Sequence, residues 1–125
     1  MRGSIVSVDI GNIKISNESP LLLIAGPCVI ESKTLAEEVA GTLKEITDRL
    51  SVPFIYKSSF DKANRTSANG IRGMGMDATL TDFLAIKKQY NVKTLTDVHD
   101  VTQVNAITNQ YNDAVDVLQI PAFLC

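Results

Sequence analysis

The chain has 125 residues, of which 45% are apolar and 21% charged, a composition typical of one soluble globular domain and not of a disordered segment. Its formal charge of −2 argues against a nucleic-acid-binding protein and against attraction to an anionic membrane surface. Two cysteines cannot build a disulfide framework, which favours a reducing, cytoplasmic compartment. We expect neither a signal peptide nor a membrane span, because the longest aliphatic run, Leu21–Ala25, is too short for either.

Residues 1–20 are predicted to form a separate N-terminal β-hairpin. Apolar and polar residues alternate on both sides of Gly11 and Asn12, a pair that favours a two-residue turn. The alternating apolar residues are Ile5, Val8, Ile13 and Ile15.

Four short apolar runs follow the hairpin and are predicted to be strands of a parallel sheet. They are rich in Leu, Ile and Val and do not alternate with polar residues, which is typical of parallel strands buried on both faces. Helical patterns separate the runs, and this alternation predicts βαβ units in an α/β fold. The four runs are Leu21–Ala25, Phe54–Tyr56, Val92–Leu95 and Val115–Ile120.

The first helix is predicted from apolar residues spaced three and four apart between the first two runs. Ser32 or Thr34 can cap its N-terminus, and Thr34 with Glu37 matches a capping box. We expect one apolar face to point inward: Leu35, Val39, Leu43, Ile46 and Leu50.

Two further helices are predicted between the later runs. One covers Ala78–Tyr90 with Asp77 as its cap, and the other begins after Asp100, with Gln103 three residues on. In the former helix we expect three side chains to face inward: Leu80, Phe83 and Leu84. The connection Ser59–Met76 is unusually long, and long loops inside compact domains are often functional.

A basic, hydroxyl-rich string, Lys57–Ser67, begins at the end of the second run. Lysine offers a point charge and arginine a planar fork, while Ser, Thr and Asn can bond the remaining oxygens of a phosphorylated, anionic ligand. The alternative is a solvated loop whose charges serve only solubility. The cations of the string are Lys57, Lys62 and Arg65.

Other polar residues lie toward the carboxyl ends of the remaining strands, where α/β sheets and β/α barrels carry their active sites. Cys28 follows the first run, Asp97 and His99 follow the third, and Gln119 lies near the end of the fourth. Each has a purely structural explanation: a buried thiol for Cys28, a helix cap for His99, and backbone partners for Asp97 and Gln119. Their shared position at one end of the sheet favours a common anionic-ligand site.

Four motifs spread over nearly the whole chain: Leu22–Ser32, Lys57–Ser67, Thr96–His99 and Leu118–Cys125. Together and in this order they resemble the 3-deoxy-D-manno-octulosonate 8-phosphate synthase (KDO8P synthase) family. The second motif is the most specific to that family. The first, around its Gly-Pro-Cys segment, is also similar to the related 3-deoxy-heptulosonate 7-phosphate synthases.

The resemblance implies a (β/α)8 TIM-barrel transferase, of which residues 21–125 would form roughly the first four βα units. Members are normally cytoplasmic homotetramers that condense phosphoenolpyruvate with D-arabinose 5-phosphate for lipopolysaccharide sugar synthesis. In that family C3 of phosphoenolpyruvate attacks the sugar aldehyde, water adds at C2, and phosphate leaves by C–O cleavage.

By position, the resemblance also assigns roles to residues. The phosphoenolpyruvate-binding residues would be Lys57, Ser59, Lys62 and Gln119. The residues that bind arabinose 5-phosphate would be Asn64, Arg65 and Thr66. The catalytic residues at the reacting centre would be Asn64, Asp97 and His99.

Cys28 implies the metal-dependent subclass of the family, because metal-independent members carry asparagine at this position. The metal would be zinc, iron(II) or manganese, and it would orient the aldehyde and polarise its carbonyl. Its other ligands, a His, a Glu and an Asp, would lie beyond Cys125. The loop Ala68–Gly73 departs from the usual family pattern, which puts its local contacts in doubt.

Members of the family continue well past the position of Cys125 and close eight strands. We therefore expect this chain to be an excerpt of a longer protein and to be inactive alone, because it lacks half of the site. Two alternatives stay open. One is a heptulosonate phosphate synthase that uses erythrose 4-phosphate, and the other is a non-catalytic half-barrel that binds phosphate or assembles with a second chain.

Overall fold

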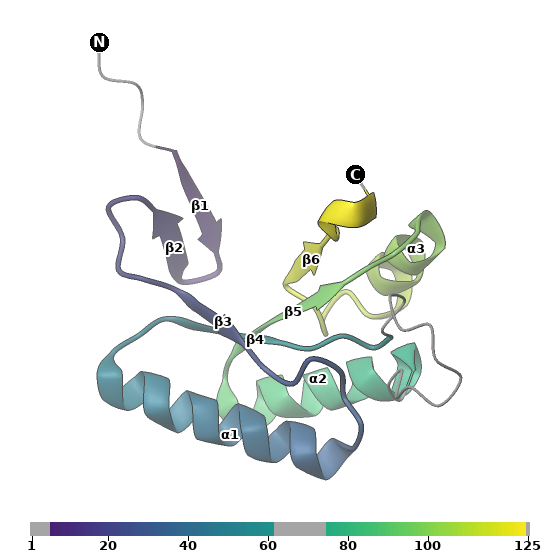
Figure 1. The fold of residues 1–125 in the computed structure, drawn as a ribbon, viewed down its shortest axis with the longest axis horizontal. Helices are drawn as coiled ribbons and strands as arrows, with labels where there is room; N and C mark the ends of the chain where they lie inside the picture. Colours follow the sequence, from purple (N-terminus) through teal and green to yellow (C-terminus); the bar gives the residue numbers. More distant parts are fainter. Residues whose placement is uncertain (1–5, 62–74, 125) are drawn as a thin grey trace.

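The chain forms a small antiparallel hairpin and a four-stranded parallel sheet with helices packed against it (Figure 1). This computed structural model describes residues 6–61 and 75–124. The parallel strands lie in the sequential order β3-β4-β5-β6, so the predicted α/β fold with a parallel sheet is confirmed. Their bounds are Leu23–Ala25 for β3, Phe54–Lys57 for β4, Lys93–Asp97 for β5 and Val117–Gln119 for β6.

The N-terminal hairpin expected from the sequence is present. β1 (Ser7–Ile10) and β2 (Ile13–Ser16) pair antiparallel around Gly11 and Asn12. Gly11 has a φ of 58°, the left-handed conformation that such turns require. A Cβ atom on Gly11 would lie 2.6 Å from Cε of Lys93, so the turn sits against the start of β5. The hairpin therefore lies at the amino ends of the parallel strands.

Burial differs between the central and the outer strands of the parallel sheet. Ile55 of β4 and Leu95 of β5 are buried, as expected for strands covered on both faces. Ile24 of β3 is 45% exposed, and the residues of β6 are only half-buried. The prediction of burial on both faces is wrong for β3 and β6: they are the outermost of the described parallel strands, and the described residues leave part of their faces uncovered.

α1 spans Lys33–Leu50 and begins at Ser32, whose Oγ accepts a hydrogen bond from the N–H of Leu35 at 3.2 Å. Of the two predicted caps, Ser32 is therefore confirmed. Thr34 lies inside the first turn, so the capping box predicted for Thr34 and Glu37 is wrong.

The buried face of α1 is rotated from the predicted one. The helix packs against β4 and α2 through small residues, among them Ala36 and Ala40, which allow a close approach. Leu35 is 43% exposed and Leu50 is 63% exposed. These leucines lie beside the contact because neighbouring positions on a helix point roughly 100° apart. The apolar stripe exists as predicted, but it points partly outward.

α2 (Met76–Tyr90) begins two residues earlier than predicted, and Asp77 lies in its first turn instead of capping it. Leu80 and Phe83 are fully buried, as expected. Leu84 is exposed, so the prediction that it faces inward is wrong. A helix that directs Phe83 into the core turns the next side chain away from it.

α3 (Val101–Gln110) begins at Asp100 as predicted, and Oδ1 of Asp100 accepts a hydrogen bond from the N–H of Gln103 at 2.8 Å. A 3-10 turn, η1 (Ala122–Leu124), follows β6. None of the helices in the described ranges is long and apolar enough to cross a membrane.

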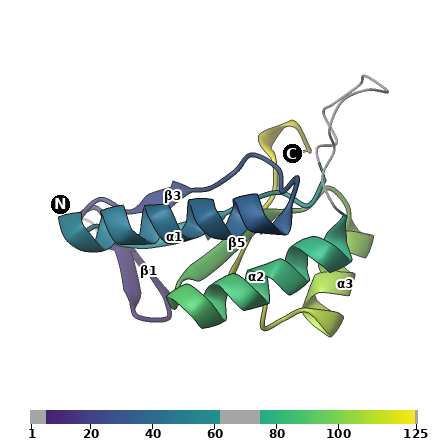
Figure 2. The same ribbon diagram turned by 90° about the horizontal axis from the view of Figure 1, so that it is seen from below.

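The main core lies between the helices and one face of the parallel sheet. α1 and α2 run side by side on that face (Figure 2). Tyr56 of β4 meets Phe83 of α2 edge to face, with ring centroids 5.6 Å apart and planes at 78°. This geometry suits aromatic quadrupoles and fixes α2 over the centre of the sheet.

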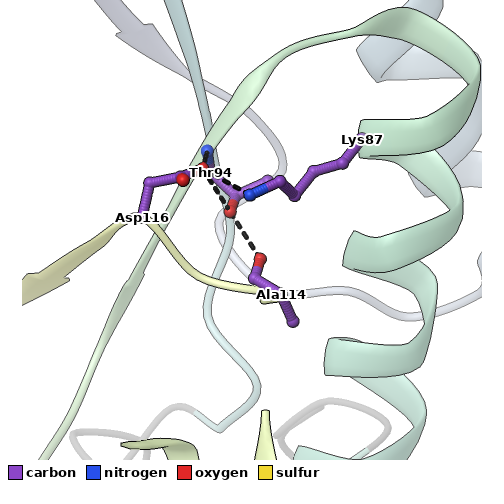
Figure 3. A network of polar contacts seen from close by, with 4 residues as sticks. All are labelled: Lys87, Thr94, Ala114 and Asp116. Atoms are coloured by element: carbon purple, nitrogen blue, oxygen red, sulfur yellow. Dashed lines mark hydrogen bonds and ion pairs between the residues drawn. The ribbon is translucent and has the colours of Figure 1, made fainter. Parts of the chain in front are cut away.

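A second set of contacts joins α2 to β5 and to the segment that leads into β6 (Figure 3). Nζ of Lys87 donates to Oδ2 of Asp116 at 2.8 Å, and the N–H of Thr94 donates to the same oxygen at 2.8 Å. The hydroxyl of Thr94 donates to the carbonyl of Ala114 at 2.5 Å. We call these four residues the Asp116 clasp.

Candidate active site

The carboxyl ends of the parallel strands place several predicted site residues at one edge of the sheet. Lys57 is the last residue of β4, Asp97 of β5 and Gln119 of β6, and Asp97 is paired directly with Gln119 in the register. The N–H of Val98 continues the pairing by donating to the carbonyl of Gln119 at 3.0 Å. Lys57 is half-buried. Its strand, β4, lies between β3, which leads to Cys28, and β5, which ends at Asp97.

The loop after β3 is held against the end of β4 by tight backbone packing. A Cβ atom on Gly26 would lie 1.8 Å from the carbonyl oxygen of Lys57, so only glycine fits this close approach. The hydroxyl of Ser58 donates to the carbonyl of Pro27 at 2.7 Å. These contacts fix the loop that carries Cys28. The cysteine is exposed, so the explanation of Cys28 as a buried thiol is wrong.

Ser59, Asp97 and His99 form a hydrogen-bonded chain at the centre of this edge. The hydroxyl of Ser59 donates to Oδ1 of Asp97, and Nε2 of His99 lies 3.2 Å from Oδ2 of Asp97. Both carboxylate oxygens are therefore engaged by side chains. The side chains of Asp97 and His99 are 9% and 12% exposed. The alternative, in which Asp97 only accepts hydrogen bonds from backbone amides, is therefore wrong.

The imidazole of His99 is shielded on one side by an aromatic ring. The rings of His99 and Phe123 are stacked, with centroids 6.5 Å apart and planes at 27°. Nδ1 of His99 is buried and has no hydrogen-bond partner among the described residues. When the neutral ring donates from Nε2 to Asp97, Nδ1 keeps its lone pair and can accept a proton or a hydrogen bond.

Two residues near His99 were not predicted as site residues. Phe123 provides the stacked ring, and Gln103 accepts a hydrogen bond from the N–H of His99 at 2.7 Å. Asp100 is the cap of α3, so the explanation of His99 as the helix cap is wrong. The sequence signalled Gln103 only as a helix-start residue, and it gave no signal for the stack.

The remaining predicted ligand-binding residues cannot be placed. They lie outside the described residues, and their roles stay predictions: Lys62, Asn64, Arg65 and Thr66.

A hollow of about 660 Å³ lies at the opposite end of the molecule. It is lined by the hairpin and by the amino ends of the parallel strands, including Asn12, Asn91 and Lys93. None of the predicted site residues that lie within residues 6–61 and 75–124 lines it. Active sites of parallel β/α folds lie at the carboxyl ends, so we assign the chemistry to the edge that carries Asp97 and His99.

The described residues do not form a metal site by themselves. No group of three or more His, Cys, Asp or Glu side chains is gathered within residues 6–61 and 75–124, whereas a bound zinc or similar ion needs three or four protein ligands. Cys28 is exposed beside the strand ends and can serve as one ligand.

The sequence profile of the DAHP synthetase I family matches residues 4–125, almost the whole chain. The chain belongs to the DAHP synthetase I family. Within this family it is 51% identical over 119 residues to proteins named 2-dehydro-3-deoxyphosphooctonate aldolase from Brucella ovis and Brucella abortus. The same identity is found with the protein of that name from Brucella canis. Each match covers 95% of this chain and 42% of the relative, so the chain spans less than half the length of these curated relatives.

The relatives confirm the resemblance to octulosonate phosphate synthases that the four motifs indicated. The aldolase name and the synthase name denote the same enzyme. The heptulosonate synthase alternative fits less well, because the relatives at 51% identity carry the octulosonate name.

Proposed function

We propose that this chain belongs to an octulosonate phosphate synthase, which joins phosphoenolpyruvate to D-arabinose 5-phosphate and releases phosphate. The observation that carries the proposal is the identity of 51% over 95% of the chain to the Brucella aldolases. The Ser59–Asp97–His99 chain at the strand ends supports it, since it is a proton-handling group at the expected edge of the sheet.

The proposed reaction balances as one new carbon–carbon bond, one water consumed and one phosphate released. C3 of phosphoenolpyruvate attacks the aldehyde carbon, and the aldehyde oxygen takes up a proton. Water adds at C2 and loses a proton, which leaves a hydroxyl group there. The bond from C2 to the phosphate oxygen then breaks, so phosphate leaves with that oxygen and the hydroxyl proton, and C2 becomes the ketone carbon. We assign the protonation of the aldehyde oxygen to His99, held by Asp97: Nδ1 takes up a proton and passes it to this oxygen, and the pair lies at the end of β5 beside the residues proposed to bind substrate.

The proposed substrate contacts follow the position of each residue. Lys57 and Ser59 lie at the end of β4 and Gln119 at the end of β6, where they would hold phosphoenolpyruvate together with Lys62. A lysine ammonium suits the phosphate and carboxylate of that substrate. The proposed contacts with arabinose 5-phosphate come from Asn64, Arg65 and Thr66, and Asn64 also belongs to the proposed catalytic group.

We also propose that Cys28 contributes one thiolate ligand to a divalent ion, whether zinc, iron(II) or manganese. The ion would supply Lewis-acid polarisation of the aldehyde. The exposed position of Cys28 beside the strand ends supports this role. The other ligands would come from parts of the protein outside the described residues.

The proposed architecture is a closed β/α barrel in which this chain supplies the hairpin (residues 1–20) and the first four βα units (residues 21–125). The outward apolar side chains at the edges of the sheet support it. They include Leu21 and Ile24 on the β3 side and Ile120 on the β6 side. A homotetramer in the cytoplasm, serving lipopolysaccharide sugar synthesis, is proposed from the resemblance.

The alternative function is a non-catalytic half-barrel that binds phosphate or assembles with another chain. It is favoured by the exposed apolar side chains on the β3 and β6 sides of the described sheet, which a second chain would cover. In that case the strand-end cluster would bind an anion without turning it over.

The proposal is tested by measuring phosphate release by the full-length protein that contains this chain. We expect turnover with phosphoenolpyruvate and D-arabinose 5-phosphate, and little with erythrose 4-phosphate. The 125-residue chain alone should release no phosphate. Metal analysis of the full-length protein should find a bound divalent ion that Cys28→Asn loses. Preference for erythrose 4-phosphate would identify a heptulosonate synthase, and binding of phosphoenolpyruvate without turnover would favour the half-barrel alternative.

A further inference from the structure

His99 is held from three different elements. Its Nε2 contacts Oδ2 of Asp97 on β5 at 3.2 Å, and its ring stacks on Phe123 of η1. Its main-chain N–H donates to Oε1 of Gln103 on α3 at 2.7 Å. The first two contacts act on the ring, whereas the third acts on the backbone from which the ring projects.

The contact from Gln103 departs from an ordinary helix cap. In a capping box, the third residue of the helix bonds back to the N–H of the capping residue. Asp100 is the capping residue of α3, yet the side chain of Gln103 passes it and bonds to the N–H of His99. Helix capping alone does not require this choice of partner.

The backbone at His99 has already left the sheet. The last strand-to-strand contact is the bond from the N–H of Val98 to the carbonyl of Gln119. One residue later, the N–H of His99 is bonded to Gln103. The Gln103 amide therefore continues the restraint beyond the end of β5, at the point where the direction of the imidazole is set.

We propose that Gln103 is a positioning residue for His99: by binding the His99 main chain, it directs the imidazole between Asp97 and Phe123. This inference rests on the proposed function, in which His99 handles a proton at the reacting centre. Without the amide oxygen, the N–H of His99 loses its acceptor and the ring can tilt away from Asp97.

The chain offers a direct test, because His99 is its only histidine. The imidazole therefore gives a single set of NMR signals that needs no further assignment. In the 125-residue chain, we expect Gln103→Leu to shift the His99 amide and both imidazole proton signals, and to reduce the ring-current effect of Phe123. Gln103→Glu keeps an oxygen acceptor at the same reach and should restore the hydrogen-bonded amide signal.

Two matched variants separate positioning from general effects on α3. Asp100→Ala removes the helix cap and leaves the bond from Gln103 to His99 in place, so the imidazole signals should stay near their wild-type positions. Gln110→Leu makes the same substitution at the other end of α3 and should also leave them unchanged. If Gln103→Leu prevents folding, Gln103→Met serves instead, since it keeps the length of the side chain without the amide. The proposal is overturned if Asp100→Ala moves the imidazole signals as far as the Gln103 variant does, or if the Gln103 variant leaves them in place.

Kinetics of the full-length protein supply a second measurement. Gln103→Leu should lower kcat roughly tenfold and leave KM for both substrates nearly unchanged, because it disturbs the orientation of His99 and not substrate binding. A wild-type protein that does not condense the two substrates would contradict the proposed function alone. The NMR comparison would still decide whether Gln103 positions His99.

Discussion

Asp82 is a buried carboxyl group that the candidate site does not use. Asp82 is 2% exposed, and Glu37 lies beside it. Burial raises the pKa of Asp82 from its ordinary value of 3.8 to about 6, and the nearby negative charge of Glu37 adds to the shift while Lys33 opposes it. Asp82 therefore holds its proton more tightly in the folded protein than in the unfolded chain, and it is charged at neutral pH at a cost in stability.

This shift predicts a pH-dependent stability with a definite sign. Because the folded pKa lies above the unfolded value, the stability from Asp82 is fully present below about pH 3.8 and is lost as the pH rises through about 6. Asp82→Asn removes the charge, so at neutral pH it should raise the free energy of unfolding by about 3 kcal/mol, which corresponds to the shift from 3.8 to about 6. Near pH 4 the variant and the wild type should be almost equally stable. Urea unfolding of the chain at both pH values measures the difference.

Asp77→Asn is the matched control for this prediction. Asp77 is an exposed carboxylate in the first turn of the same helix, so its replacement should leave the pH slope of the wild type unchanged. An equal effect of Asp82→Asn at the two pH values would show that the buried charge is not the cause.

At the scale of elements, the Asp116 clasp joins α2 to the sheet. Burial alone would raise the pKa of Asp116, but hydrogen bonds from Lys87 and from the N–H of Thr94, with the charges of Lys87 and Lys93, outweigh it and lower the pKa. The stability from this carboxylate is present above its ordinary pKa and is lost as the pH falls through the lowered value. The stability contributed by the clasp therefore falls as the pH is lowered, whereas the stability contributed by Asp82 falls as the pH is raised.

Lys87→Met tests the clasp. It removes the ammonium and keeps most of the apolar stem, so we expect the free energy of unfolding at neutral pH to fall by about 1 kcal/mol, since the pair is partly exposed to solvent. Acid unfolding should also begin at a higher pH. Lys88→Met changes the exposed neighbour on the same helix and should have little effect. Equal losses from the two variants would mean that the Lys87–Asp116 contact adds nothing specific.

The sequence predicted the order of the elements well because its signals for them are local. Apolar runs, caps such as Asp100, and the Gly11 turn each act within a few residues. It did not predict which side of α1 faces the core, because that depends on Ala36 and Ala40 meeting elements far along the chain. Periodicity marks an apolar stripe but does not say what covers it.

In the candidate site, too, the local signals were predictable from the sequence and the long-range contacts were not. The carboxyl-end rule gathered Lys57, Asp97 and Gln119 from their places after separate runs, and the structure places all three at one edge. The stacking of Phe123 on His99 depends on the path of the chain after β6, to which the order of residues gives no guide. The unusual reach of Gln103 to His99 is likewise a matter of three-dimensional geometry.

At the scale of the whole molecule, the described residues leave apolar side chains exposed on the β3 side of the sheet. On the β3 side, the exposed Leu35 of α1 lines a groove on that helix, Leu50 is exposed at the end of the helix, and Ile24 is exposed on the strand itself. A helix in a β/α barrel has a neighbour on each side, and among the described elements the main contacts of α1 are with α2 and β4. Burying these apolar side chains against a further strand–helix unit would be more favourable than leaving them exposed to water.

Assembly in trans tests this fit. The part of the Brucella ovis aldolase that lies beyond its match to this chain should, when co-expressed with the chain, co-purify with it in equal amounts and release phosphate from the two substrates. Leu35→Lys should weaken the complex, because it places a charge in the apolar contact, whereas Glu45→Lys changes an exposed residue off the stripe and should not. Analytical ultracentrifugation measures the assembly. If the chain instead forms a stable dimer with itself that Leu35→Lys disrupts, the same stripe serves self-association, and the half-barrel module becomes the better account of the molecule.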